Sequence, residues 1–203
     1  GAIYNGRIAP VAPYGICGTI WYQAESNCGR GEDPRDYRHK QRALVEGWRQ
    51  AWNNENLPFF YVQLPQWKSY AWTYAREEQF RAMEVDGTGM AVTIDLDNAS
   101  DIHPPNKIDV GERLARWPLA KVYGKKIPFS GPLFRDVNVR DAEVVVRFDY
   151  AKEGLMVGHI EGVGKIVEAK DGVLHGFELV GEDGVWHPAK AKVQGQAVLV
   201  KSL

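Results

Sequence analysis

The 203-residue sequence lacks several features that would narrow its function at once. It has no apolar run of the length that a membrane-spanning helix needs. Its formal net charge is only −1, so bulk electrostatics would not attract nucleic acid or an anionic membrane. With 44% hydrophobic and 25% charged residues, it has the composition of an ordinary globular protein. We therefore expect no nucleic-acid or membrane partner.

Cysteine is also scarce, with only Cys17 and Cys28. Cys17 falls in a strand-like run and Cys28 in the loop that follows, which favours two free or buried thiols over a disulfide. Four of the five histidines show no metal-ligand spacing among themselves or with the cysteines. No phosphate-binding loop is present. The sequence therefore predicts neither a metal site nor a cofactor.

Serine occurs five times, and none of the five lies in a Gly-x-Ser-x-Gly motif of the kind that presents a nucleophile. Only Ser26 lies at the end of a predicted strand in polar surroundings. A serine nucleophile needs a base within reach, so Ser26 is a candidate only if the chain folds it against a histidine. An ordinary polar turn is the alternative interpretation.

The first part of the chain alternates strands with helices. Continuous apolar runs predict buried strands, and apolar spacing on one face predicts the helices between them. The predicted strands are 16–22, 59–64 and 90–96, and the predicted helices are 33–52, 70–85 and 109–123. This order indicates an α/β domain with a parallel sheet between helical layers. Three strands are few, because such sheets usually have about five or six.

The second part has a different pattern. Apolar and polar residues alternate in short segments separated by turn signals such as 170–173 and 181–184, which is typical of antiparallel strands. The segments are 137–139, 143–148, 165–169, 176–180 and 197–200. We expect two regions, an α/β domain over 1–128 and an antiparallel β region over 129–203.

Two polar segments follow predicted strands, where open α/β sheets place their ligands. Asp101 and His103 follow the third strand; the acid could fix the tautomer of a general-base imidazole, or it could simply cap a turn. Gln23, Glu25 and Asn27 follow the first strand.

Side-chain amides and main-chain N–H groups of the segment from Gln23 to Asn27 could form an oxyanion hole, although a polar turn is the plainer interpretation. Arg76 and Gln79 lie three residues apart on a predicted helix and share a face. An exposed helix face is the usual explanation, and a pair that lines a substrate site, with Arg76 suited to a sugar carboxylate, is the alternative.

Five motifs follow one another along the chain: Tyr4-Asn5-Gly6, Trp21-Tyr22-Gln23-Ala24-Glu25-Ser26-Asn27, Arg76-Glu77-x-Gln79, Asp101-Ile102-His103-Pro104-x-Asn106-Lys107 and Gly111-x-Arg113-Leu114-Ala115. In this order they resemble the sialate O-acetylesterases, the sialic acid-specific acetylesterases of the SGNH-hydrolase superfamily. The resemblance covers nearly the whole chain.

The resemblance implies a partial SGNH-hydrolase-like three-layer α/β/α domain followed by antiparallel β structure. It implies an esterase that uses no cofactor, with His103 and Asp101 as catalytic residues and Gln23, Glu25 and Asn27 in the oxyanion loop. Arg76 and Gln79 would line the site of an O-acetylated sugar, either sialic acid or a related plant- or glycan-derived sugar. The parent protein would work in a secreted, periplasmic or lysosome-like compartment.

The chain departs from the family pattern in three ways. Ala24 stands where the family usually has glycine, and Pro118 stands where it normally has a helix former. The Gly-Gln-Ser-Asn-like motif that carries the nucleophile is absent. We therefore expect the C-terminal portion of an esterase, inactive by itself, whose serine lies on an N-terminal segment or a second chain that completes the sheet. The alternatives are a non-catalytic carbohydrate-binding or structural protein and, less favoured, a complete esterase that uses Ser26.

Overall fold

The computed structural model describes residues 1–29, 31–96, 100–103, 105–140 and 143–202. The chain divides into two compact units, Gly1–Phe129 and Ser130–Leu203. A short helical segment, Tyr4–Ile8, begins the first unit. Each unit has its own sheet and its own core.

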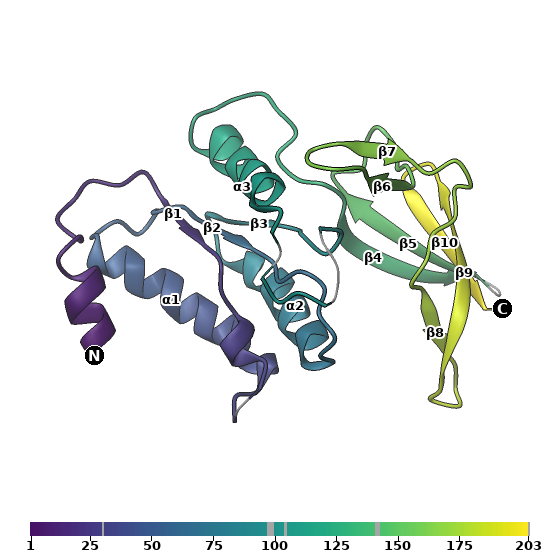
Figure 1. The fold of residues 1–203 in the computed structure, drawn as a ribbon, viewed down its shortest axis with the longest axis horizontal. Coiled ribbons are helices and arrows are strands. Elements are labelled where there is room, and N and C mark those ends of the chain that lie inside the picture. The colour runs from purple at the N-terminus through teal and green to yellow at the C-terminus, as the bar shows by residue number, and fades with distance from the viewer. Residues whose placement is uncertain (30, 97–99, 104, 141–142, 203) are drawn as a thin grey trace. The chain divides into compact units, whose positions relative to one another are not determined.

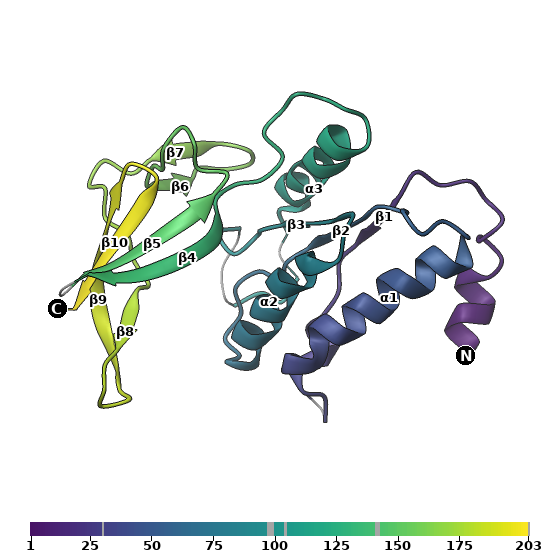
Figure 2. The same cartoon turned by 180° about the vertical axis from the view of Figure 1, so that it is seen from behind.

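The first unit is built on a three-stranded parallel sheet in the order β1 (Thr19–Trp21), β2 (Phe59–Val62) and β3 (Thr88–Ala91). Every residue of β2 is buried, which explains its continuous apolar sequence. Both ribbon views place α3 on one face of the sheet and α1 and α2 on the other (Figures 1 and 2). The predicted α/β class with a parallel sheet is confirmed.

Its helices are α1 (Tyr37–Ala51), α2 (Ala71–Arg81) and α3 (Lys107–Lys121). α3 begins two residues before the predicted start because Asn106 caps it. The Asn106 Oδ1 atom accepts a hydrogen bond from the Asp109 main-chain N–H at 3.2 Å, and its Nδ2 donates to Asp109 Oδ2 at 2.7 Å.

Gly124 follows α3 with a φ of +65°, a conformation that glycine adopts without strain. α2 is shorter than predicted, and a 3-10 turn over Ala82–Glu84 replaces its last residues.

The prediction of the third strand over 90–96 was wrong at both ends. Beyond β3 the chain leaves the sheet, because its polar groups bind partners elsewhere. The Val92 carbonyl accepts from Arg113 Nη1 at 2.9 Å, and the Thr93 hydroxyl donates to the Gln63 carbonyl at 2.7 Å. Arg113 Nη1 and Nη2 also donate hydrogen bonds to the Asp95 carboxylate, at 2.6 and 2.8 Å. The residues at the end of the apolar run therefore begin a loop that these hydrogen bonds hold in place.

The core between β3 and α3 depends on the absence of a side chain at Gly89. A Cβ atom there would overlap the indole ring of Trp117. Trp117 cannot easily move, because its Nε1 donates to the Met90 carbonyl at 3.0 Å and its ring packs against Phe60 and Phe129.

We therefore expect Gly89→Ala to lower the free energy of unfolding by about 3 kcal/mol through overpacking. Six of the seven tryptophans lie in the first unit, so urea unfolding followed by tryptophan fluorescence measures this effect. Gly111→Ala is the matched control, because an added Cβ there meets no atom within 4 Å and α3 should gain about 0.5–1 kcal/mol. Equal effects of the two substitutions would contradict the packing argument.

The second unit is antiparallel, as predicted. Its main sheet has the order β4-β5-β10-β9-β8, and β6 and β7 form a separate pair. The strands are β4 (Leu133–Arg140), β5 (Glu143–Asp149), β6 (Gly158–Ile160), β7 (Ile166–Glu168), β8 (Glu178–Val180), β9 (Trp186–Gln194) and β10 (Ala197–Ser202). β9 was not predicted from the sequence, because its exposed positions include Pro188, and proline is rare inside strands.

Cys17 is exposed and Cys28 is partly buried, and both are free thiols, as the sequence favours. Over the described ranges, no helix has the length and apolar character needed to cross a membrane.

Candidate active site

Three loops leave the sheet at one edge. Because β1, β2 and β3 are parallel neighbours, the segments that follow them start side by side at their carboxyl ends. These segments are 22–28, 63–70 and 92–106. The residues predicted to form the oxyanion loop lie on the first segment, and Asp101 and His103 lie on the third.

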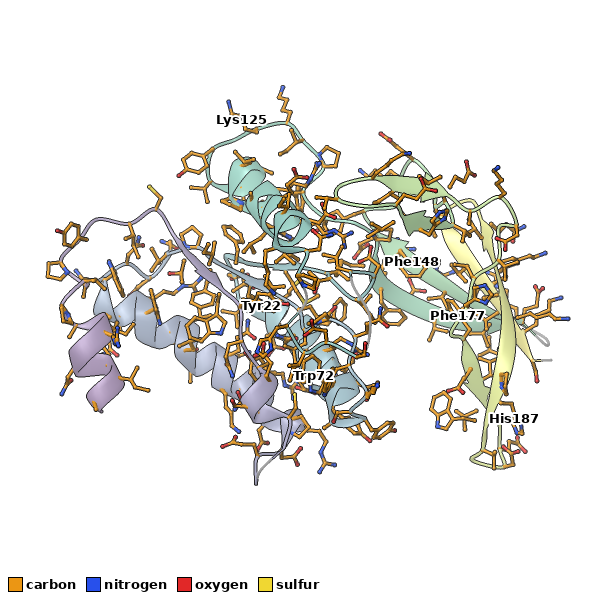
Figure 3. The ribbon with its side chains drawn as sticks, in the orientation of Figure 1. Tyr22, Trp72, Lys125, Phe148, Phe177 and His187 are labelled. Carbon is orange, nitrogen blue, oxygen red and sulfur yellow. The ribbon has the colours of Figure 1, made fainter. Side chains whose placement is uncertain are left out.

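A small apolar core lies beneath these loops and draws on all three of them. Its members and the side chains packed against it are Tyr22, Ala24, Cys28, Tyr37, Leu64, Trp67, Trp72, Ala75 and Ile102 (Figure 3 labels Tyr22 and Trp72). Ile102 stands between Asp101 and His103, and Ala24 is completely buried. The two predicted parts of the site therefore share one core.

Polar contacts fix the first loop to its neighbours. The Tyr37 hydroxyl donates to the Gln23 carbonyl at 2.7 Å. The Lys107 ammonium lies 5.1 Å from the centre of the Tyr22 ring, a cation–π contact that links the loop to the start of α3. Residues from α1 and α3 thus hold the loop after β1 from both sides.

Within this loop the polar side chains bind one another. Gln23 Nε2 donates to Asn27 Oδ1 at 2.8 Å, which leaves its second N–H for another acceptor. The Glu25 carboxylate accepts from the Ala24 main-chain N–H at 2.9 Å, and Asn27 Nδ2 donates to Glu32. Ala24, where the sequence departs from the family's glycine, has a φ of 168° and a ψ of −6° and is completely buried.

Gln79 supports the site from below. Its side chain is 1% exposed. Its Oε1 accepts from the Leu64 main-chain N–H at 2.9 Å, and its Nε2 donates to the Val62 carbonyl at 3.2 Å and reaches the Gln23 carbonyl at 3.4 Å. The amide thus ties the ends of β1 and β2 together.

Arg76, one turn earlier on α2, is half-buried and donates to the Pro65 carbonyl at 3.3 Å. Burial lowers the pKa of its guanidinium below the usual value, and the nearby Cys28 acts in the opposite direction.

Asp101 and His103 are both exposed and adjoin the site loop through Ile102. Asp101 Oδ1 accepts a hydrogen bond at 2.8 Å from the main-chain N–H of His103. In this structure the carboxylate therefore fixes the turn that carries the histidine, which is the contact expected of a capped turn. The catalytic role of the pair stays a prediction, because catalytic contacts often tighten only when substrate is bound.

The comparison with known families agrees with this arrangement. The family model described as carbohydrate esterase, sialic acid-specific acetylesterase, matches residues 6–119, which is more than half of the chain. The chain belongs to this family. The match contains the whole three-stranded sheet and each of the predicted site residues.

Relatives in the sialic acid-specific acetylesterase family are much longer than this chain. Mouse sialate O-acetylesterase is 28% identical over 174 residues, covering 74% of this chain and 32% of the relative. Human sialate O-acetylesterase is 30% identical over 154 residues, which cover 64% of this chain and 29% of the human protein. A crystal structure of a carbohydrate acetylesterase from Xanthomonas citri superposes with a TM-score of 0.84 and 33% identity, over 98% of this chain and 45% of that one. The chain spans about a third of the curated relatives.

The loop after β1 holds two side chains that could be considered as nucleophiles. Ser26 is exposed on a single 3-10 turn, and among the described residues no hydrogen bond joins it to His103. Burial, together with the charge of Glu25, raises the pKa of Cys28 to about 11, although Arg76 lowers it. The Cys28 thiol is therefore protonated at neutral pH and is a poor nucleophile.

Sequence reasoning assigned no role to the residues that assemble the site, although two of them lie in a family motif. Tyr37, Lys107 and Ile102 contact the first loop or its core from elements distant in sequence. Ile102 could have been noticed as an apolar residue between two polar ones in a loop, which indicates an anchor. No local signal marks Tyr37, because its role depends on the start of α1 packing under the loop after β1.

Proposed function

We propose that this chain forms the histidine- and acid-bearing part of a carbohydrate O-acetylesterase. A single observation carries the proposal: Ile102, between Asp101 and His103, packs on the same core as Ala24 of the family's site loop. This arrangement sets a histidine beside a loop of amide donors at the carboxyl edge of a parallel sheet. The substrate would be an O-acetylated sugar, with sialic acid favoured by the names of the relatives.

In the proposed reaction a serine from outside these 203 residues attacks the acetyl carbonyl while His103 accepts the hydroxyl proton. The oxyanion that forms takes hydrogen bonds from the second N–H of the Gln23 amide and from main-chain donors of the loop. His103 then returns the proton to the departing sugar oxygen. A water molecule, deprotonated by the same histidine, then attacks the acetyl-serine. His103 returns this proton to the serine oxygen as acetate leaves, and Asp101 holds the loop of His103 throughout.

The open edge of β1 supports a second polypeptide segment as partner. β1 pairs only with β2 among the described strands, and its Ile20 is 68% exposed. An apolar cavity of about 770 Å³ lies beside it, lined by Ile3, Tyr4, Trp21 and Trp48 among others. An unpaired parallel edge with apolar surface is a site for strand addition. We propose that the serine-bearing segment, whether N-terminal or separate, adds its strand here.

The proposal is tested by an aryl acetate assay of the chain with and without the polypeptide encoded upstream of residue 1. We expect no hydrolysis by the chain alone and hydrolysis by the mixture, because only the mixture contains both serine and histidine. Hydrolysis by the chain alone that Ser26→Ala abolishes would identify a complete esterase and contradict the proposal. Demonstrated association without hydrolysis would also contradict it, in favour of a non-catalytic carbohydrate-binding protein.

A further inference from the structure

An exposed pair of tyrosines lies on the rim of the candidate site. Tyr70 is 73% exposed and Tyr74 is 40% exposed. Their rings meet edge to face, with centroids 5.3 Å apart and planes at 90°. This is a favourable aromatic geometry, so each ring restricts the other, yet most of Tyr70 stays open to solvent. The pair therefore presents an exposed aromatic surface of defined geometry.

The position of this pair follows from the topology. Tyr70 immediately precedes α2, and α2 starts at the carboxyl edge of the sheet, where the site loops emerge. Trp67 and Trp72 flank Tyr70 in sequence and both pack with the core beneath these loops. Tyr70 is therefore the last residue of the loop that follows β2, and its side chain is exposed to solvent.

A charged pair borders the aromatic surface. The Arg35 guanidinium lies 6.0 Å from the centre of the Tyr74 ring. It is fixed by Asp33, which accepts from Arg35 Nε and Nη2 at 2.9 and 2.7 Å. The Arg35 hydrogen bonds lower the pKa of Asp33 to about 2, so both partners stay charged at neutral pH. Arg35 keeps further N–H donors and Asp33 keeps acceptor capacity.

We propose that Tyr70, Tyr74 and Arg35 form a subsite for a second sugar ring, the one to which the acetylated sugar is linked. A pyranose offers what this surface can bind: an apolar face of C–H groups for the electron-rich ring of Tyr70, and hydroxyl groups at its edge for Arg35 and Asp33. The inference rests on the proposed function, because it takes the acetylated sugar to lie at the loops after β1 and β3. It makes the preferred substrate a glycan chain rather than a free monosaccharide.

Chemical-shift titrations of the ¹⁵N-labelled chain with lactose and with 3′-sialyllactose test the subsite. We expect shifts around residues 33–35 and 70–74, and roughly tenfold weaker binding of both probes by Tyr70→Ala, the loss expected from one aromatic contact. Tyr70→Phe should bind as the unchanged chain does, because the ring face is retained. Free sialic acid lacks the second ring, so Tyr70→Ala, Tyr70→Phe and the unchanged chain should all bind it with equal affinity.

Tyr14→Ala is the matched control. Tyr14 is 74% exposed but precedes β1, so it lies on the amino side of the sheet, and its loss should leave lactose binding unchanged. Absence of shifts at 70–74, or equal affinities of Tyr70→Ala and the unchanged chain, would overturn the subsite. Lactose binding needs no ester chemistry, so this result is independent of the reconstituted esterase assay, which tests the proposed function.

Discussion

Replacing His103 with alanine should lower kcat/KM for an aryl acetate by about 10⁴-fold or more. This value refers to the completed esterase, which is the proposed complex of this chain with the polypeptide that supplies the serine. The reason is that a serine hydroxyl is a weak nucleophile until a base removes its proton, and removal of the base from such a triad leaves only the contributions of binding and the oxyanion hole. The chain is mixed with the polypeptide that is proposed to supply the serine, and initial rates are compared at equal concentrations of the complex.

His175→Ala provides the control for this substitution. His175 is also an exposed histidine, but it lies in the second unit and on none of the three loops that follow the strands of the parallel sheet. Both replacements remove an exposed ring, so both should change the free energy of unfolding by less than about 0.5 kcal/mol. A His103→Ala complex that keeps a tenth of the original activity would exclude His103 as the general base.

The place of the site could be predicted from the sequence because it depends on local patterns. Apolar runs located the strands, and the polar residues that follow them were therefore assigned to one edge. Family motifs then added roles for His103 and for Gln23. These inferences need only the order of the elements along the chain, and an error of a few residues at the ends of a strand, as at β3, does not disturb them.

The internal bonding of the site could not be predicted in the same way. A spacing of two residues between Asp101 and His103 indicated an acid beside an imidazole, but the loop bends and the carboxylate binds the main-chain N–H. Such competition between side-chain and backbone partners is decided by loop geometry, which sequence spacing does not specify. The role of Gln79 in lining the substrate stays a prediction. Helix periodicity places this residue on a face but does not say that the face meets main-chain groups at the ends of two strands.

Gln79 and Gln41 form a natural comparison. Both are amides on helices of the first unit, and they are 1% and 3% exposed. The Gln79 amide contacts main-chain groups at the ends of two strands. The Gln41 Nε2 and Oε1 atoms have no hydrogen-bond partner among the described residues. The two amides are equally buried, but one is hydrogen-bonded and the other is not. We therefore expect the same substitution to change the free energy of unfolding in opposite directions.

Gln79→Leu should lower the free energy of unfolding by about 3 kcal/mol. Leucine matches glutamine in size, but it leaves the Leu64 N–H and the Val62 carbonyl buried without a partner, at about 1–3 kcal/mol each. Gln41→Leu should instead raise it by about 1 kcal/mol, because it removes a buried polar group that makes no hydrogen bond.

Urea unfolding followed by tryptophan fluorescence measures both values for Gln79→Leu and Gln41→Leu, and an unchanged m-value shows that the unfolded states are comparable. In the completed esterase Gln79→Leu should also lower activity at temperatures where it remains folded, because the Gln23 carbonyl loses a support. Destabilisation of similar size by the two substitutions would mean that their effects come from helix packing. The amide of Gln79 would then have no special part in holding the site loop against β2.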